Sequence, residues 1–336
     1  MEKCILVISD QHIPHHHTDM MDFLRAIKKK YSFTMIKLNK LYIAIAATLI
    51  GIICVDSYGV IIKSLGQIYP ITQLNVFRNG FAVLPLLAVF IITKEFSSLF
   101  KNLNFRFIII CCVRGICFAL MHVFYFAAII NMDFATASTL TFSSPFFIAL
   151  LSIFFLGDKV GIYRWLAIII GFIGVVMIMR PDTDLFSIYS IFPILVALLF
   201  SIAMIILRFI PDSYSTSKIQ FYSLLFSVIG AILLFLISDD HVPVENYNHL
   251  LLMVLTGVLG GIAAILFIFA YRLVSPSKLA TFEYVGIPSS FFLGWIFFNE
   301  LPISQLFPGV IVIVFAGMII IWRDTLKEKI PREIKQ

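Results

Sequence analysis

Residues 249–271 read HLLLMVLTGVLGGIAAILFIFAY and contain no Asp, Glu, Lys or Arg. A helix needs about 20 predominantly apolar residues to cross the hydrocarbon core of a bilayer. The run is long enough for that crossing, and it has no charged face with which to lie in water. This segment therefore predicts a transmembrane helix.

The rest of the chain has the same character. It has 336 residues, of which 60% are hydrophobic and 13% are charged, and its mean hydropathy is +1.00. A soluble domain has about 25% charged residues. The sequence therefore predicts an all-α integral membrane protein with ten transmembrane helices, at residues 41–62, 71–93, 107–129, 134–156, 162–179, 186–207, 216–237, 249–271, 278–298 and 303–322.

The loop charges predict the orientation of these helices. Short turns at 131–133 and 299–302 make neighbouring helices antiparallel. If the N-terminus is cytoplasmic, most of the 25 Lys and Arg residues lie in the N-terminal segment, the even-numbered turns and the C-terminal tail. The positive-inside rule then places both termini in the cytoplasm. It also accounts for the net charge of +6 without a nucleic-acid partner.

The chain also repeats itself. At one constant offset, Phe124–Ala127 matches Phe267–Ala270, and Pro145 matches Pro288. Because each half holds five helices, an odd number, the second half must enter the membrane upside down, as in secondary transporters built from inverted repeats. The predicted organisation is a first five-helix repeat at 37–180, a second at 186–323 and a cytoplasmic tail at 324–336.

Residues 1–36 lie outside this pattern. The apolar run Cys4–Asp10 predicts a strand, and Asp19–Lys30 a helix. Asp10-Gln11-His12 resembles the opening motif of calcineurin-like metallophosphoesterases, in which both side chains bind a metal, but the later ligands of such a domain are absent. We expect an extra cytoplasmic segment without a metal, either a fusion remnant or a misassigned start, with the transporter beginning near Met35.

Four charged residues lie deep inside predicted helices, away from the helix ends: Asp56, Arg78, Arg114 and Glu283. Each costs about 2.5–3.5 kcal/mol at a helix centre unless it is paired or hydrated. Counted from the membrane faces, Asp56 matches Arg78 near the outer side, and Arg114 matches Glu283 near the inner side. Two ion pairs are predicted. They would act as gates or anchor the substrate, or would only neutralise each other between packed helices.

The two matching prolines interrupt corresponding helices. Proline removes a backbone hydrogen bond and frees a carbonyl, and paired breaks point to the central site of a transporter. A plain kink is the alternative. Ser143, Ser144 and Tyr284 lie at these breaks.

His122 lies eight residues beyond Arg114, broadly on the same helix face, and is either a proton relay or a packing residue. Four aromatic residues are candidates for stacking on a planar solute: Tyr58, Tyr125, Phe142 and Tyr284.

The sequence resembles the EamA type of the drug/metabolite transporter superfamily over residues 37–323. The motifs that carry the resemblance are Phe77-Arg78, Arg114-Gly115, Ala135–Ser138, Phe154–Asp158, Arg180-Pro181, Phe282–Tyr284 and Phe297–Glu300. They are similar to those of bacterial S-adenosylmethionine uptake and riboflavin carriers. The resemblance implies two inverted five-helix EamA repeats around a central cavity, alternating access and no ATP hydrolysis.

The predicted function is a secondary active transporter of the bacterial inner membrane, not an enzyme, and without a cofactor. It would move a small organic metabolite or cofactor, such as S-adenosylmethionine, riboflavin or an amino-acid-like solute. The alternatives are a membrane-tethered metallophosphoesterase remnant and a non-transporting receptor. Its partners would be the substrate and the lipid bilayer, and a homodimer is left open. The predicted gate is Asp56 with Arg78, and the predicted substrate-binding residues are Arg114, Glu283, Tyr284, Ser143, Ser144 and His122.

Overall fold

The computed structural model describes residues 17–101, 103–157, 162–179, 188–274, 279, 282–283, 286–316 and 318. The chain forms two units, residues 1–43 and 44–336. In the first unit, the described residues form the beginning of α1 (His17–Leu65), which includes the helix predicted at Asp19–Lys30. The strand predicted at Cys4–Asp10 and its Asp10-Gln11-His12 motif lie outside the described residues.

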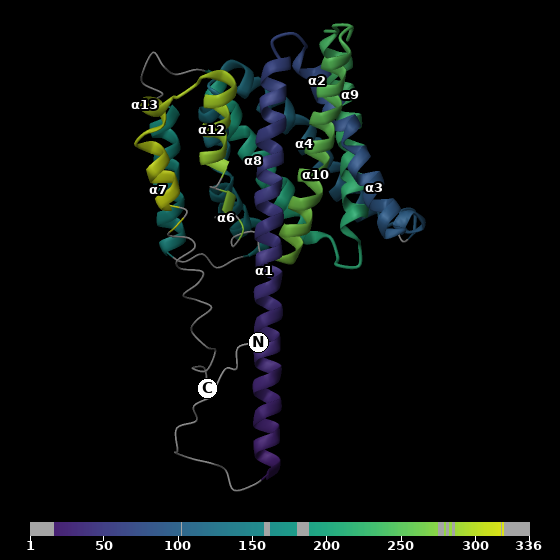
Figure 1. Ribbon diagram of the computed structural model, residues 1–336, viewed down its shortest axis with the longest axis vertical. Coiled ribbons are helices and arrows are strands. Elements are labelled where there is room, and N and C mark those ends of the chain that lie inside the picture. The colour runs from purple at the N-terminus through teal and green to yellow at the C-terminus, as the bar shows by residue number, and fades with distance from the viewer. Residues whose placement is uncertain are drawn as a thin grey trace. The chain divides into compact units, whose positions relative to one another are not determined.

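In the described part of the second unit, helices and the loops between them form the structure (Figure 1). After α1, the elements are α2 (Ile71–Phe81), α3 (Val83–Thr93), η1 (Glu95–Ser98), α4 (Phe105–Asn131), α5 (Phe134–Thr141), α6 (Ser144–Leu156), α7 (Ile162–Met179), η2 (Ile188–Ser190), α8 (Ile191–Ile205), η3 (Ile206–Phe209), α9 (Thr216–Ser238), α10 (Tyr247–Leu273), α12 (Gly286–Phe298) and α13 (Ile303–Leu306).

Within the described residues, seven segments are long and apolar enough to cross a membrane: Lys40–Leu65, Ile71–Thr93, Phe105–Asn131, Phe134–Phe155, Ile188–Phe209, Thr216–Ser238 and Tyr247–Leu273. Each coincides, within a few residues, with a span predicted from the sequence. Two shorter apolar helices, Ile169–Ile178 and Gly286–Phe298, lie within the predicted fifth and ninth spans. The described part of the chain is thus all-helical, and its apolar spans are those of a multi-pass membrane protein.

The outer surface of the helices carries large apolar side chains. Ile91, Ile92, Phe154 and Ile237 are 71–80% exposed. A water-soluble monomer does not present many such side chains together, whereas lipid tails solvate them. The exposed apolar surface therefore agrees with the membrane assignment.

Two prolines explain where long spans break into shorter helices. Pro85 is the third residue of α3, and the chain leaves regular helix at Ala82, just after α2. Pro145 lies in the first turn of α6, and the break predicted there from the sequence separates α5 from α6 between Thr141 and Ser144. Proline lacks the amide hydrogen that would continue the preceding turn. The α5–α6 break faces the cavity described below.

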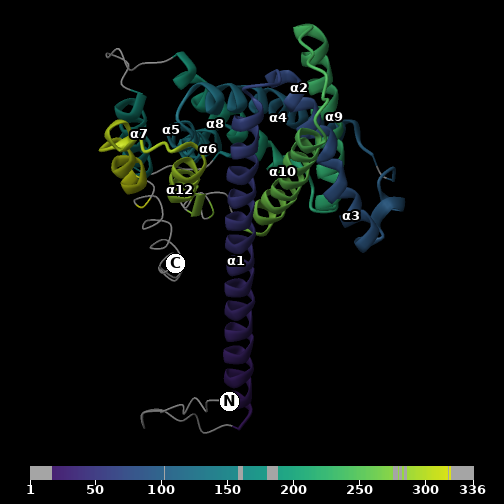
Figure 2. The same cartoon turned by 45° about the horizontal axis from the view of Figure 1, so that its top comes forward.

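Helices from the two halves of the sequence pack directly against each other. α4 contacts α8 and α9, α10 contacts α2 and α3, and α5 contacts α12. Figures 1 and 2 show α2, α4, α9 and α10 in one group. Close approach depends on glycine at two points of α10: a Cβ on Gly257 would lie 2.3 Å from Phe81 Cβ, and one on Gly261 would lie 2.6 Å from the Ala82 carbonyl.

A polar cluster joins the end of α1 to the loops after α4 and α12. Lys63 Nζ donates to Glu300 Oε1 at 2.6 Å and to the Met132 carbonyl at 2.7 Å. The other carboxylate oxygen of Glu300 accepts from the Phe134 amide at 2.7 Å, at the start of α5. Burial and the nearby Glu300 carboxylate raise the pKa of Asp133 above its ordinary value, and Lys63 opposes the shift.

Candidate transport site

A cavity of about 140 Å³ lies between the two halves of the second unit. Its walls come from α1, α2, α4, α5 and α6 of the first half and from α8, α9 and α10 of the second, together with Glu283. The polar side chains in the walls are Asp56, Tyr58, Arg78, Asn79, His122, Tyr125, Ser138, Thr141, Ser144, Gln220, Ser223, Ser227 and Glu283. Such a concentration of polar groups inside apolar helices is typical of a solute pathway rather than of a packed core.

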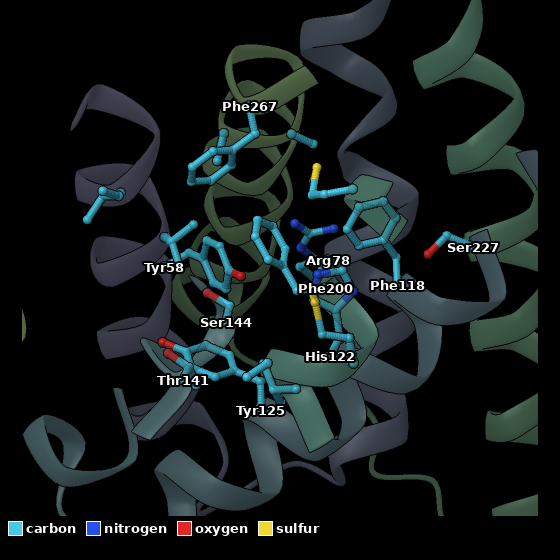
Figure 3. A pocket seen from close by; sticks show the side chains of 18 of the residues that line it. Tyr58, Arg78, Phe118, His122, Tyr125, Thr141, Ser144, Phe200, Ser227 and Phe267 are labelled. Atoms are coloured by element: carbon cyan, nitrogen blue, oxygen red, sulfur yellow. The ribbon is translucent and has the colours of Figure 1, made fainter. Parts of the chain in front are cut away.

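Arg78 of α2 is the cationic side chain in the cavity wall and is 6% exposed. Its Nη1 donates to Asn79 Oδ1 at 3.2 Å, and its Nη2 donates to the Gly260 carbonyl of α10 at 3.3 Å. The guanidinium carbon lies 5.3 Å from the centre of the Tyr58 ring, which is a cation–π arrangement. Figure 3 shows both side chains at the centre of the cavity. The guanidinium is thus fixed in place by two helices.

Asp56 of α1 is 2% exposed and also lines the cavity. Its Oδ2 has no hydrogen-bond partner among the described residues. The side chain of Ser289, in α12, lies beside the carboxyl group. Oδ2 is therefore open to a hydrogen-bond donor that enters the cavity.

Glu283 is held differently, because protein donors satisfy both of its carboxylate oxygens. Tyr271 of α10 donates its hydroxyl to Oε1, and Ser144 donates to Oε2 at 3.2 Å. The backbone of Ser144 is anchored in turn, because Ser201 of α8 donates to its carbonyl at 3.0 Å. Hydrogen bonds to an ionised group stabilise it by about 1.5–3 kcal/mol each. Glu283 therefore joins α10, α6 and α8 at the cavity wall.

Aromatic and aliphatic side chains form the rest of the wall. His122 is 1% exposed, and its ring lies between Phe118, with ring centres 6.4 Å apart, and Phe126, at 5.9 Å. Figure 3 places His122 beside Arg78. Three of the four aromatic residues predicted to stack on a solute, Tyr58, Tyr125 and Phe142, line the cavity.

The sequence prediction missed a network of uncharged polar residues on α2 and α9. Asn79 donates to Asn75 Oδ1 at 2.6 Å, and Ser227 donates to Asn79 Oδ1 at 2.9 Å. Asn75 donates to the Ala119 carbonyl of α4 at 3.1 Å. The signal was the helical spacing of Asn75 and Asn79, one turn apart on α2. The network fixes the rotation of α2, and with it the position of Arg78.

The structure places five predicted site residues in the cavity wall: Asp56, Arg78, His122, Ser144 and Glu283. Ser143 and Arg114 are buried outside it: Ser143 Oγ donates to the Leu140 carbonyl at 2.8 Å, and Arg114 donates to Ser223 at 3.3 Å and to the Ala203 carbonyl. Tyr284 lies outside the described residues.

The two predicted ion pairs are wrong. Within the part of the chain that the structure describes, Asp56 and Arg78 form no salt bridge, nor do Arg114 and Glu283. Matching depth in the membrane does not fix the rotation of a helix. Arg114 lies where α4 packs against α8 and α9, whereas His122 faces the cavity. Eight residues at 3.6 per turn leave these two side chains about 80° apart.

The described residues contain no group of three or more His, Cys, Asp and Glu side chains that could hold a metal ion. The polar groups of the cavity are hydroxyl, amide, carboxyl, imidazole and guanidinium groups. They are suited to recognising an organic solute.

Several known proteins are similar to this chain. Residues 42–180 match the EamA-like transporter family. The chain is 28% identical to a pseudopaline exporter of Pseudomonas aeruginosa over 259 residues, which cover 76% of this chain and 88% of the exporter. It is 25% identical to an S-adenosylmethionine uptake transporter of Rickettsia bellii, over 56% of this chain and 64% of that protein.

A riboflavin transporter of Rhizobium johnstonii is 29% identical over 58% of this chain and 64% of that protein. A solved crystal structure shares the fold, with a TM-score of 0.60 and 17% sequence identity, over 86% of this chain and 99% of the solved one.

Proposed function

The chain carries an EamA-family domain of the drug/metabolite transporter superfamily, and on that premise we propose that it is a secondary active carrier working by alternating access. The relatives are named as uptake transporters and exporters of small metabolites, so the protein is a small-metabolite transporter and not an enzyme. The observation that carries the proposal is the polar cavity enclosed by helices of both halves. Candidate substrates are S-adenosylmethionine, riboflavin and amino-acid-like solutes.

The proposed topology has ten helices in two inverted repeats, at 37–180 and 186–323, with a cytoplasmic tail at 324–336 and an extra segment at 1–36. The repeated motifs and the seven spans that coincide with predicted ones support it. The distribution of Lys and Arg supports an inner-membrane location with both termini cytoplasmic. We propose no nucleic-acid partner and no cofactor, and a homodimer is one assembly to test.

The proposed roles of the site residues differ from those expected from the sequence. Asp56 and Arg78 would bind the substrate rather than close a gate, because each carries an unpartnered polar atom at the cavity. Glu283 and Ser144 would also contact it, because both line the same cavity. His122 would line the path.

The remaining predicted residues take supporting roles. Arg114 would stabilise the position of α4, and Ser143 would stabilise the α5–α6 break, without contacting the cavity. Tyr284 remains a proposed lining residue on the strength of its sequence motif.

Flux measured in proteoliposomes tests the carrier function. The purified chain should accumulate radiolabelled S-adenosylmethionine or riboflavin in a saturable way, relative to protein-free liposomes. Specific binding without flux for either solute would instead support the receptor alternative. Removal of residues 1–36 should leave the flux unchanged. Loss of a phosphodiesterase activity on that removal would revive the metallophosphoesterase alternative.

A further inference from the structure

The cavity contains polar atoms that the protein itself leaves without partners. In the described part of the chain, four lining side chains each bury one such atom: Asp56 Oδ2, Arg78 Nε, His122 Nδ1 and Gln220 Oε1. Each of these residues is at most 6% exposed. Buried polar atoms in folded proteins are almost always hydrogen-bonded. Their concentration in one cavity indicates that an occupant supplies the missing partners.

Two of these atoms belong to groups of opposite charge that do not neutralise each other. Asp56 and Arg78 form no salt bridge, although both line the same cavity. The Arg78 guanidinium instead makes a cation–π contact with the Tyr58 ring and donates a hydrogen bond to the Gly260 carbonyl. A buried charge without a counter-charge is unfavourable. A solute that carries both counter-charges can form an ion pair with Asp56 and with Arg78 at once, whereas a neutral solute can only hydrogen-bond to them.

The charge balance of the wall argues against an anionic solute. Two carboxyl side chains, Asp56 and Glu283, share the cavity with one guanidinium, Arg78. Each oxygen of Glu283 already accepts a hydrogen bond from Tyr271 or Ser144, whereas Asp56 Oδ2 accepts none, so Asp56 is the carboxylate better placed to meet a cation. A free anion would gain one partner at Arg78 and would face two carboxylates.

The apolar part of the cavity fits a planar group. Tyr58, Phe118, Tyr125, Phe142, Phe200 and Phe267 all line it. Figure 3 labels Tyr58, Phe118, Tyr125, Phe200 and Phe267, which come from helices of both halves. Aromatic rings arranged in this way favour stacking on another ring system.

We infer that the transported solute is a zwitterion with a planar aromatic body: its carboxylate binds Arg78, its cationic group binds Asp56, and its ring system lies among the aromatic side chains. This inference rests on the proposed carrier function and narrows it. Of the candidates above, it favours S-adenosylmethionine and aromatic amino acids over riboflavin, which has no ammonium or carboxylate group.

A matched panel of probes tests the inference on the wild-type protein. Thermal shift and counterflow in proteoliposomes are measured with S-adenosylmethionine, L-tryptophan, L-tryptophanamide, indole-3-propionate and riboflavin. The two zwitterions should bind and exchange. The amide, which lacks the carboxylate, should bind about tenfold more weakly because one charge-assisted hydrogen bond is lost, and the anionic propionate should bind more weakly still.

Variants of Arg78 and Asp56 then test which charge of the solute each residue binds. Arg78→Gln and Asp56→Asn should each lower affinity for the zwitterions at least tenfold, and Arg78→Lys and Asp56→Glu should restore part of it. Arg106→Gln and Asp240→Asn remove exposed charges outside the cavity and should change neither affinity nor flux. Gel filtration checks the fold of each variant.

The outcomes separate this inference from the carrier function. Exchange of riboflavin or of the propionate without exchange of either zwitterion would overturn the inference and leave the carrier standing. Zwitterion exchange that survives both charge-removing variants would also overturn it. No exchange of any probe would count against the inference and the carrier function together.

Discussion

Lys63 Nζ lies 2.6 Å from Glu300 Oε1, which joins the last turn of α1 to the loop after α12. The Lys63 and Glu300 side chains are only 9% and 20% exposed, and Glu300 also accepts from the Phe134 amide. Exposed ion pairs contribute little to folding stability. The Lys63–Glu300 pair differs from them, because it is shielded from solvent and Glu300 accepts a second charge-assisted hydrogen bond. It ties three segments together at one end of the helices.

We predict that Glu300→Gln destabilises the protein by about 2 kcal/mol, the scale of one lost charge-assisted hydrogen bond. The measurement is thermal unfolding in detergent. The matched control is Asp212→Asn, because the carboxylate of Asp212 is fully exposed and lies 3.6 Å from Arg272. It should not shift the midpoint measurably. Equal shifts in the two variants would mean that the Lys63–Glu300 pair has no special role.

Gly260→Ala should disable the site without unfolding α10. The added Cβ would lie 2.6 Å from Arg78 Nε and 2.7 Å from Nη2, so the guanidinium would have to move. We expect substrate flux to fall at least about tenfold, the effect of losing roughly 1.4 kcal/mol of binding. Gly80→Ala is the control, because a Cβ there meets nothing within 4 Å. A Gly260→Ala protein with normal flux would contradict the placement of Arg78.

Glu283→Gln should reduce uptake in vesicles and leave expression and folding intact. The side chain keeps its size, but one end of the amide can no longer accept from Tyr271 or Ser144. Tyr271→Phe removes one donor from the same carboxylate and should reduce uptake less. Unchanged transport by Glu283→Gln would reject the assignment of this residue to the site.

Asp133 gives a prediction about pH. Burial and the Glu300 carboxylate raise the pKa of the Asp133 carboxyl, so folding favours its protonated form. The contribution of the protonated Asp133 carboxyl to folding stability is therefore present at low pH, and it is lost as the pH rises through the raised pKa. Asp133→Asn has no such loss, and the structure shows no side-chain cap bond from Asp133 that Asn would remove.

The measurement compares the unfolding midpoints of Asp133→Asn and the wild type from pH 4 to pH 8. The variant should have the higher midpoint at pH 8, and the difference should shrink toward pH 4. A difference that grows on acidification would show that the carboxylate is stabilised, not penalised, by its surroundings.

Much of the fold was predictable, because apolar length is a strong signal in a membrane protein. Seven spans, the α5–α6 break at Pro145 and five cavity residues follow from the sequence. Charges inside apolar helices were the most informative feature, since a buried charge usually faces a cavity or a partner. Asp56, Arg78 and Glu283 all line the cavity.

The partners of these charges could not be predicted from the sequence. Arg114 and Glu283 have matching depth, but α4 is rotated so that Arg114 meets the Ala203 carbonyl and Ser223. Packing between helices far apart in the sequence sets that rotation. The spacing of apolar residues within one helix does not predict it. Gln220 and Ser227 were missed because uncharged polar residues change the hydropathy of an apolar helix little.

Access to the cavity from each side of the membrane tests the carrier mechanism most directly. Thr141 lines the cavity, and Thr141→Cys can be made in a background that lacks the five native cysteines. A membrane-impermeant maleimide is applied to right-side-out and to inside-out vesicles. We expect labelling of Cys at this position from both sides, and protection by a bound substrate in both preparations. Labelling from one side alone, whether or not substrate is present, would contradict alternating access.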